Sequence, residues 1–365
     1  MNKQYIIIDN GSGSIKAGYS DKKIPSVVEQ TLLGNIRRLK GGCVIGPGVF
    51  TTYFGKDANY RRAILNIGQP IQKGVITNWN QIEKFWDFIM RSKLNADVEN
   101  SFVMLTETPN NSHSNRVDMC QKMFECFNVK GVYIEKQPKL ALYSIGKQRG
   151  TVVDSGEGKT QCTSIIDGNI IKESIQNVDI TGEDITKYLI KYFNYDNICL
   201  TTRSEIDEAK IIKERHCYAL LNEDNKKNRK YTMPDGTTIT LKDPLYKSIE
   251  VLFNPVLCGK EQGGIVDKCI ESISKVDISL RKSLYSNIVL VGGNTMYENL
   301  PERFTQDIKK QMKEEENLNV TAPFNRLYSV WLGGAILTEL SSFKDKWITK
   351  KEYEEKGEFA LSKID

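Results

Sequence analysis

The sequence has few histidines and no closely paired cysteines, the residues that most often bind zinc. It has only two histidines, and its eight cysteines include no C-x-x-C pair. We therefore expect no zinc site. Scattered cysteines without such pairing are typical of a reducing compartment, here the cytosol or the nucleus.

Long apolar runs are also absent. No stretch reaches the roughly 18 apolar residues that a membrane-spanning helix needs, and residues 1–4 lead straight into an expected strand. We therefore expect neither a membrane span nor a signal peptide. The net charge is only +5, and no basic stripe alternates with aromatic residues, so nucleic acid is not expected as a direct partner. The basic run 226–230 is interpreted as a solvated loop, with contact to nucleic acid or an acidic partner as the alternative.

Several familiar catalytic and nucleotide-binding motifs are incomplete. Residues 158–160 resemble the end of a P-loop, but Val153 stands where that motif needs its first glycine. Gly11 and Gly13 lack the third glycine of a dinucleotide fingerprint, because Lys16 stands there. No G-x-S-x-G or Cys/His arrangement indicates a nucleophilic hydrolase.

Two similar turns are present instead. Residues 9–13 and 154–158 each place an Asp at the end of a β-branched strand, with glycines two and four positions later. Glycines there let the backbone turn tightly and bring N–H groups close to phosphate oxygens. A carboxylate at the strand end can hold Mg²⁺ through its waters. One such turn is weak evidence, but two predict a duplicated fold in which two hairpins bind one polyphosphate.

The rest of the chain alternates strands with helices, which predicts an α/β protein. At 365 residues it suits two domains. Asn78 is expected to cap the first long helix, with Gln81 three residues on. Residues 41–54 are interpreted as a surface loop, or alternatively as a mobile tongue with Val44, Ile45 and Val49 at its tip. We expect helices at about 78–89, 115–124, 182–193, 204–220, 261–275, 301–316 and 335–340, strands at 101–105, 132–134, 151–155 and 286–291, a polar loop at 222–231 and a turn at 233–236.

A series of short stretches then matches one family in order. The sequence resembles actin and its relatives from about residue 5 to 357, in stretches at 9–13, 16–18, 74–79, 105–107, 115–116, 124–125, 127–129, 154–156, 328–331 and 347–350. The resemblance implies a duplicated ribonuclease-H-like fold with two lobes, and ATP or ADP with Mg²⁺ or Ca²⁺ in the cleft between them. The implied lobes are 1–144 plus 329–365, with an insertion at about 32–69, and 145–328, with an insertion at about 181–260.

The resemblance also implies roles for individual residues. The β- and γ-phosphates are expected to contact one lobe at Gly11, Ser12, Gly13 and Lys16. From the other lobe they are expected to contact Ser155, Gly156, Glu157, Gly158 and Lys159. The metal's waters are expected to contact Asp9 and Asp154, and the attacking water Gln137, with Asp154 and Gln161 as further catalytic residues. The adenosine pocket is expected to comprise Gly182, Lys213, Glu214, Gly292, Gly293, Asn294, Met296 and Tyr297.

The sequence departs from the family pattern near the expected phosphates. Gln161 stands in place of His and Glu157 in place of Asp, changes that would slow hydrolysis because positioning of the water is worth orders of magnitude. Lys159 replaces an aliphatic residue and would either favour the transition state or tighten binding. Pro138 replaces a small residue and is expected to keep Gln137 extended. Leu327 replaces a basic residue that helps to cover adenine, so ATP binding is predicted more firmly than turnover.

The expected binding surfaces differ as well. The family's groove for amphipathic helices or a neighbouring subunit is kept at Tyr143, Gly146, Leu332, Ile336 and Leu340. Asn169 stands there in an aromatic position. The apolar plug keeps Leu252, Phe253 and Pro255, but Lys260 replaces an apolar residue. The acidic N-terminal tail and the C-terminal Cys-Phe are missing, which favours an actin-like or actin-related protein over conventional actin.

Three functions remain open. The first is an ATP-binding, actin-like cytoskeletal protein that forms filaments or protofilaments, in the cytoplasm or cytoskeleton. The second is an actin-related subunit of a larger assembly, in dynactin or a chromatin remodeller in the nucleus, with structural nucleotide. Residues 284–289 and 350–355 are similar to centractin, the actin-related protein of dynactin. The third, a sugar kinase or Hsp70-type ATPase of the same fold, lacks a phosphoacceptor-binding sequence and a substrate-binding C-terminal domain.

Overall fold

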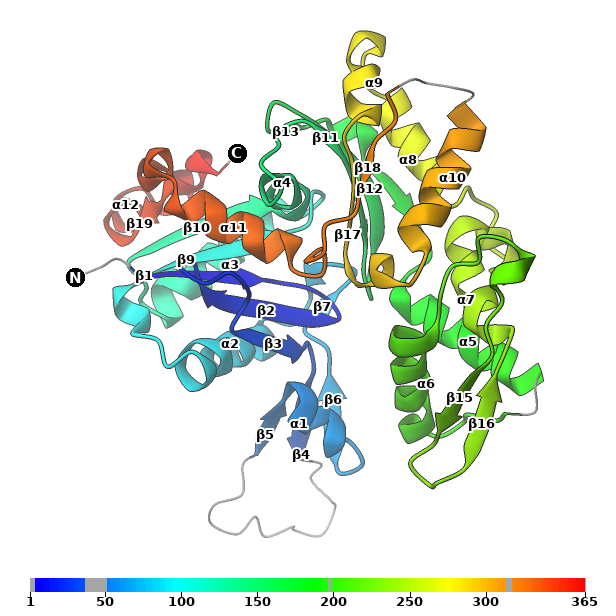
Figure 1. The fold of residues 1–365 in the computed structure, drawn as a ribbon. Coiled ribbons are helices and arrows are strands. Elements are labelled where there is room, and N and C mark those ends of the chain that lie inside the picture. The colour runs from blue at the N-terminus through cyan, green and yellow to red at the C-terminus, as the bar shows by residue number, and fades with distance from the viewer. Residues whose placement is uncertain (1–3, 37–50, 196–197, 313–316, 365) are drawn as a thin grey trace. The chain divides into compact units, whose positions relative to one another are not determined.

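The computed structural model describes residues 4–36, 51–195, 198–312 and 317–364. The expected tongue tip at Val44, Ile45 and Val49 lies outside these residues. The chain divides into two compact units (Figure 1), here called the first and second unit. The first unit comprises Met1–Gly146 with Tyr328–Asp365, and the second comprises Lys147–Leu327.

A six-stranded sheet forms the centre of the first unit, in the order β19-β10-β9-β1-β2-β3. Strands β1, β2 and β3 form an antiparallel meander, β9 and β10 run parallel to β1, and β19 closes the edge antiparallel to β10. The bounds are β1 Gln4–Asp9, β2 Ser14–Tyr19, β3 Val27–Gln30, β9 Ser101–Glu107, β10 Gly131–Lys136 and β19 Ile348–Thr349.

The sheet of the second unit repeats this pattern in the order β13-β12-β11-β17-β18, with β14 also paired to β12. Strands β11 and β12 form an antiparallel hairpin, while β17 and β18 run parallel to β11. Both sheets therefore place a hairpin beside two parallel strands in the same order, as a duplicated fold requires. The bounds are β11 Gly150–Ser155, β12 Thr160–Ile166, β13 Asn169–Ile170, β14 Gln176–Val178, β17 Ile288–Val291 and β18 Val320–Thr321.

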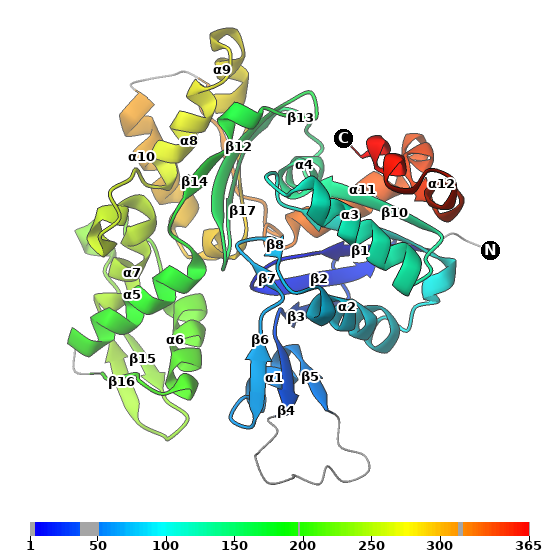
Figure 2. The same cartoon turned by 180° about the vertical axis from the view of Figure 1, so that it is seen from behind.

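The helices of the first unit cover its sheet from both sides, with α11 opposite α2 and α3 (Figures 1 and 2). Asn78 caps α2 as predicted, because its side chain accepts a hydrogen bond from the Gln81 N–H at 3.0 Å. Helix α3 begins at His113, earlier than predicted, because Ser112 and not Asn115 supplies the cap. The bounds are α1 Gly55–Tyr60, α2 Trp79–Asp87, α3 His113–Gln121, α4 Gln137–Tyr143, α11 Ser329–Glu339 and α12 Lys350–Lys356. Shorter helical turns lie at Phe88–Lys93, Val98–Asn100, Lys122–Cys126, Ser341–Lys346 and Gly357–Lys363.

The described part of the first unit also contains two smaller sheets. One has the strand order β5-β4-β6, and in the other β7 pairs with β8. The bounds are β4 Leu33–Ile36, β5 Thr52–Phe54, β6 Leu65–Gly68, β7 Ile71–Gln72 and β8 Val75–Ile76.

Helices α4 and α11 cross at very close range. A Cβ atom added to Gly333 would lie 1.8 Å from the Leu140 carbonyl oxygen, so only glycine permits this approach. The next residue, Gly334, faces Ile7 of β1, and Trp331 donates its indole N–H to the Ile7 carbonyl at 3.2 Å. These contacts attach α11 to the core of the first unit.

The second unit packs α8, α9 and α10 on one face of its sheet and carries the hairpin β15–β16 beside α6 (Figures 1 and 2). The bounds are α5 Gly182–Tyr195, α6 Arg203–His216, α7 Pro244–Phe253, α8 Ile265–Ser274, α9 Ile278–Tyr285, α10 Leu300–Met312, β15 Arg229–Thr232 and β16 Thr238–Leu241. Shorter turns lie at Lys172–Ser174, Glu223–Asn225, Pro255–Cys258 and Gly293–Met296.

Several predicted boundaries in this unit were wrong. Helix α6 ends at His216, not at 220, because Cys217 is extended (ψ 149°). Helix α8 begins at Ile265, not at 261, where the Asp267 carboxylate accepts a hydrogen bond from the Gly264 N–H. The basic run 226–230 was expected in a loop, but Arg229 and Lys230 begin β15. Lys227 and Arg229 both pair with Glu298, so part of the charge of this run is already neutralised.

No helix among the described residues is long and apolar enough to cross a membrane.

Candidate functional site

The first turn begins with a carboxylate held from three sides. Asp9 ends β1, and its Oδ1 accepts hydrogen bonds from Thr106 Oγ1 at 2.9 Å and Gln137 Nε2 at 3.3 Å. Lys16 lies opposite Asp9 in the β1–β2 register and places its Nζ 3.4 Å from Asp9 Oδ2. Because the Asp9 side chain is only 4% exposed, these partners fix its position.

Asn10 anchors the start of the turn to β9. Its N–H donates to Thr106 Oγ1 at 3.0 Å and its Nδ2 to the Thr106 carbonyl at 3.2 Å. The Asn10 Oδ1 accepts the indole N–H of Trp86 at 3.1 Å. Sequence reasoning missed both partners as site residues, although Thr106 lies within the matched stretch 105–107.

In the remainder of the first turn the acceptors of Ser12 are satisfied, while two backbone N–H groups have no described partner. Ser12 Oγ accepts the Gly74 N–H at 2.8 Å, and the Ser12 carbonyl accepts Gln69 Nε2 at 2.9 Å. Within the described residues, the N–H groups of Ser12 and Gly13 donate no hydrogen bond. Backbone donors in such a turn form a binding site for an anion.

The second turn has the same arrangement. The Gly156 carbonyl accepts the Gly182 N–H at 2.9 Å and Asn294 Nδ2 at 2.8 Å, and Asn294 also donates to Ser155 Oγ at 3.1 Å. The N–H groups of Glu157 and Gly158 make no hydrogen bond to any described residue. Among the described residues, each of the two turns therefore has two backbone N–H groups without a hydrogen bond.

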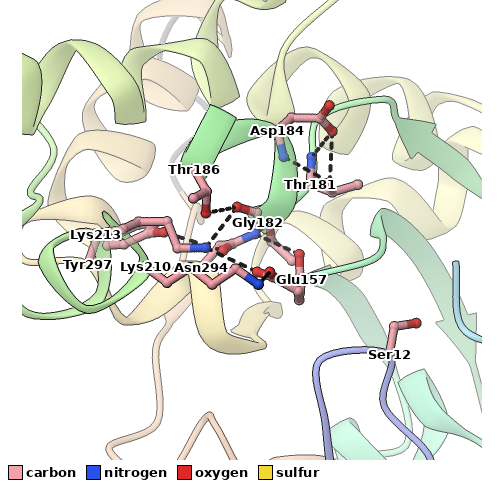
Figure 3. A network of polar contacts seen from close by, with 12 residues as sticks. Ser12, Glu157, Thr181, Gly182, Asp184, Thr186, Lys210, Lys213, Asn294 and Tyr297 are labelled. Atoms are coloured by element: carbon pink, nitrogen blue, oxygen red, sulfur yellow. Dashed lines mark hydrogen bonds and ion pairs between the residues drawn. The ribbon is translucent and has the colours of Figure 1, made fainter. Parts of the chain in front are cut away.

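Behind the second turn, a buried lysine joins three segments of the unit (Figure 3). The Lys213 Nζ lies 3.0 Å from Glu157 Oε2 and 2.7 Å from the Gly182 carbonyl oxygen. Lys210, one helical turn earlier, lies 3.5 Å from Glu157 Oε1. Burial alone would raise the pKa of Glu157, but the two lysines hold that pKa below its usual value.

Two of the predicted pocket glycines are closely surrounded, and at Gly292 the backbone requires glycine. A Cβ atom on Gly182 would lie 2.4 Å from Glu157 Oε2. Gly292 has φ +91°, and a Cβ atom there would lie 2.4 Å from the Ser155 carbonyl oxygen. Beside Gly293, by contrast, an added Cβ would meet only Leu327, at 3.8 Å.

The remaining predicted pocket residues separate into two groups. Asn294 and Tyr297 are buried beside the second turn, where the Tyr297 hydroxyl donates to Asn294 Oδ1 at 3.5 Å and burial raises the pKa of Tyr297. Met296 is 42% exposed, and Glu214 is also exposed. The structure therefore groups Gly182, Lys213, Gly292 and Asn294 around the turn, but leaves Glu214 and Met296 at the surface.

Gln161 lies on β12 between two polar partners. Its Oε1 accepts from Lys159 Nζ at 3.0 Å, and its Nε2 donates to Asn177 Oδ1 at 2.8 Å. A lysine ammonium has no acceptor, so the oxygen of the amide must face Lys159. This orientation leaves the nitrogen for Asn177, a residue that sequence reasoning did not include.

The expected backbone conformation of Gln137 was wrong. Pro138 was predicted to keep Gln137 extended, but the extended residue is Lys136 (φ −75°, ψ 128°) and Gln137 is the first residue of α4. A proline in the first helical turn loses no intrahelical hydrogen bond, so it is compatible with a helix that starts one residue earlier.

The predicted groove residues of the first unit lie in α4 and α11 or shortly after them. Ile336 and Leu340 are 40% and 48% exposed. Asn169 lies in β13 of the second unit and is exposed. Lys260 interacts with the Asp179 carbonyl oxygen and lies 3.5 Å from an Asp184 carboxylate oxygen, so its charge is partly neutralised.

A comparison with models of protein families shows which family has these paired sheets and turns. The family model of actin matches residues 1–225 and 209–363. The chain belongs to the actin family. Its duplicated sheets and two units are those of the two-lobed actin fold, so the predicted family and fold class are confirmed. The roles predicted for individual residues and the predicted lobe boundaries remain predictions.

The residues of this actin-family chain fit a cation bound through water better than one bound directly. The described part of the chain contains no group of three His, Cys, Asp or Glu residues able to hold a metal ion. Asp9 has three described donors, while a carboxylate can accept about four hydrogen bonds. One acceptor site therefore remains for a water of the cation, in line with the hydration that Mg²⁺ retains.

Proposed function

We propose that this actin-family protein binds ATP or ADP with a divalent cation. The observation that carries the proposal is the repeated turn, with an aspartate at the strand end, a nearby lysine and two backbone N–H groups that no described residue accepts. Phosphate oxygens are acceptors that match such donors.

The proposed roles follow from the contacts of each turn. In the first unit, the Ser12 and Gly13 N–H groups bind phosphate oxygens and Lys16 supplies positive charge. In the second unit, the Glu157 and Gly158 N–H groups do the same, and the pocket around Lys213 and Asn294 takes the nucleoside. When bound, the divalent cation supplies further positive charge to the phosphates through waters held by Asp9 and Asp154.

We further propose that hydrolysis is slow. Gln161 uses both ends of its amide on Lys159 and Asn177, so it is poorly placed to receive a proton or to orient a water molecule. Gln137 already donates to Asp9 and to the Asn10 carbonyl oxygen. Each amide would have to release a protein partner before it positioned the attacking water.

We propose that the protein assembles with other actin-like subunits in the cytoplasm. Ile336 of α11 and Leu340, directly after α11, present exposed apolar side chains, which suit contact with an amphipathic helix or a neighbouring subunit. We propose filaments or protofilaments as the assembled form. The alternative is a single subunit of a larger complex that holds its nucleotide structurally.

Nucleotide binding is tested with a matched pair of lysine variants. Lys16→Met removes the charge 3.4 Å from Asp9, whereas Lys22→Met removes an exposed charge whose side chain is 56% accessible. We expect Lys16→Met to weaken binding of a fluorescent ATP analogue by at least about tenfold, and Lys22→Met to leave it unchanged. Wild-type protein that carries no adenine nucleotide when purified with Mg-ATP, and that binds none when it is added, would overturn the proposal.

Assembly is tested by sedimentation after addition of Mg-ATP and salt. A pellet that grows above a critical concentration supports filaments. Persistent monomer at every concentration supports the complex-subunit alternative. A phosphate-release assay with the monomer completes the test, since rapid release without polymer would contradict slow hydrolysis.

A further inference from the structure

Lys159 is held on the hairpin of the second turn by its neighbours. It ends the turn that joins β11 to β12, and its carbonyl oxygen accepts the Gly156 N–H at 2.8 Å. Its Nζ lies 3.0 Å from Gln161 Oε1, and Gln161 is in turn held by Asn177 at 2.8 Å. This row of contacts places a positive charge at a defined position beside the turn.

The charge lies on the same face of the hairpin as Asp154. Asp154 and Gln161 are directly opposite in the β11–β12 register, and opposite residues project from the same face of a sheet. The Asp154 carboxylate acts electrostatically on Lys159. The ammonium therefore lies beside the carboxylate that is proposed to face the cation's waters.

The lysine is charged at neutral pH and partly accessible. Burial lowers the pKa of Lys159 to about 8, against the opposing effect of Asp154, so most molecules carry the charge at pH 7. The side chain keeps some surface open to solvent. An anion bound to the Glu157 and Gly158 N–H groups would lie at the same turn as this ammonium.

We propose that Lys159 is a fixed cation of the second turn, which binds the phosphates of the nucleotide and replaces part of the charge that the divalent ion supplies. The inference rests on the proposed nucleotide binding and adds one specific property to it, namely that the protein retains nucleotide when the divalent ion is removed. Without this lysine, the negative charge of the phosphates at the second turn would have to be neutralised by the divalent ion.

The test compares nucleotide affinity with and without the ion in matched variants. Wild type, Lys159→Met, Lys159→Arg and the control Lys172→Met are titrated with a fluorescent ATP analogue at pH 7, once in excess Mg²⁺ and once in excess EDTA. Lys172 is an exposed lysine of the same unit. The measured quantity is the ratio of the two dissociation constants, which cancels any uniform loss of affinity.

We expect EDTA to weaken wild type, Lys159→Arg and Lys172→Met by a similar small factor. We expect it to weaken Lys159→Met by at least about tenfold more, the size of one lost charge-assisted contact. Thermal unfolding without nucleotide shows whether each variant is folded. If Lys159→Met does not fold, Lys159→Gln replaces it, since glutamine keeps a polar group beside Gln161.

The two proposals fail in distinguishable ways. Wild type that binds no nucleotide even in excess Mg²⁺ overturns both. Wild type that binds in Mg²⁺ but shows the same EDTA ratio as Lys159→Met overturns only the role of Lys159. A larger EDTA ratio in Lys159→Met than in Lys172→Met supports it.

Discussion

The Lys213 ammonium lies 3.0 Å from the Glu157 carboxylate, and the lysine side chain is only 2% exposed. This pair ties α6 to the second turn. Because Lys213 also donates to the Gly182 carbonyl at 2.7 Å, one buried charge connects the turn, the start of α5 and α6.

Loss of this lysine should destabilise the protein markedly. Lys213→Met leaves the Glu157 carboxylate and the Gly182 carbonyl without their buried donor, and we expect a loss of roughly 3 kcal/mol in the free energy of unfolding. Lys210→Met removes a half-exposed partner 3.5 Å away and should cost less than about 1 kcal/mol. Chemical denaturation of both variants checks the difference. Equal losses would contradict a special role for Lys213.

The same carboxylate should make stability depend on pH in acid. The pKa of Glu157 is lowered in the folded protein, so its stabilising effect is fully present above the ordinary glutamate pKa of about 4.5. The effect is lost as the pH falls through the lowered pKa. We expect Glu157→Gln to flatten the loss of unfolding free energy below that pH, and exposed Glu261→Gln to leave it unchanged. A Glu157→Gln profile that parallels wild type would refute this assignment.

The crossing of α4 and α11 should tolerate alanine at one glycine and not at its neighbour. Gly333→Ala would place a Cβ atom 1.8 Å from the Leu140 carbonyl oxygen, which only movement of the backbone can relieve. Gly334→Ala would place one 3.0 Å from the Ile7 side chain, which can shift slightly. We expect a loss of more than about 3 kcal/mol for the first variant and a clearly smaller loss for the second. Thermal melting of the two proteins gives the comparison, and a reversed order would show that the crossing is not this tight.

Thr106 lies outside the first turn, but we expect it to stabilise the turn's conformation. Its hydroxyl donates to Asp9 at 2.9 Å and accepts the Asn10 N–H at 3.0 Å. Thr106→Val keeps the shape but removes these two hydrogen bonds and the one that the hydroxyl accepts from Gln137 Nε2 at 3.4 Å. We therefore expect a loss of about 2 kcal/mol in stability, together with weaker nucleotide binding. Exposed Thr51→Val is the control. Unchanged melting and unchanged nucleotide affinity in Thr106→Val would show that Asp9 and Asn10 are positioned without it.

Local patterns were enough to predict the two turns, their strands and the cap of α2. The spacing of Asp9 and Asp154 to the following glycines involves only neighbours in the chain, and so does the capping of α2 by Asn78. Helix ends were predicted less well, as the end of α6 at His216 and the start of α8 at Ile265 show. The helices α1, α4, α7, α9 and α12 were not predicted.

The side chains that hydrogen-bond or pair with the residues of the two turns could not be predicted from the sequence. Thr106 lies 96 residues from Asn10 and Lys213 lies 56 residues from Glu157, distances at which periodicity and spacing carry no information. The charge of the basic run could not be assigned either, because Glu298, which neutralises part of it, lies 69 residues from Arg229. Which polar groups are buried, and therefore which need a partner, emerges only when distant segments pack together.

Residue order thus accounts for where the backbone turns and where glycine is needed, because these are short-range effects of sterics and hydrogen bonding. Packing of distant segments accounts for which charges are paired, which side-chain amides are hydrogen-bonded and which backbone N–H groups of the two turns have no described partner. Gln161 illustrates the difference. Its place on β12 follows from the strand pattern and its contact with Lys159 lies within one hairpin, but the hydrogen bond from its Nε2 to Asn177 exists only after β12 and β14 have come together.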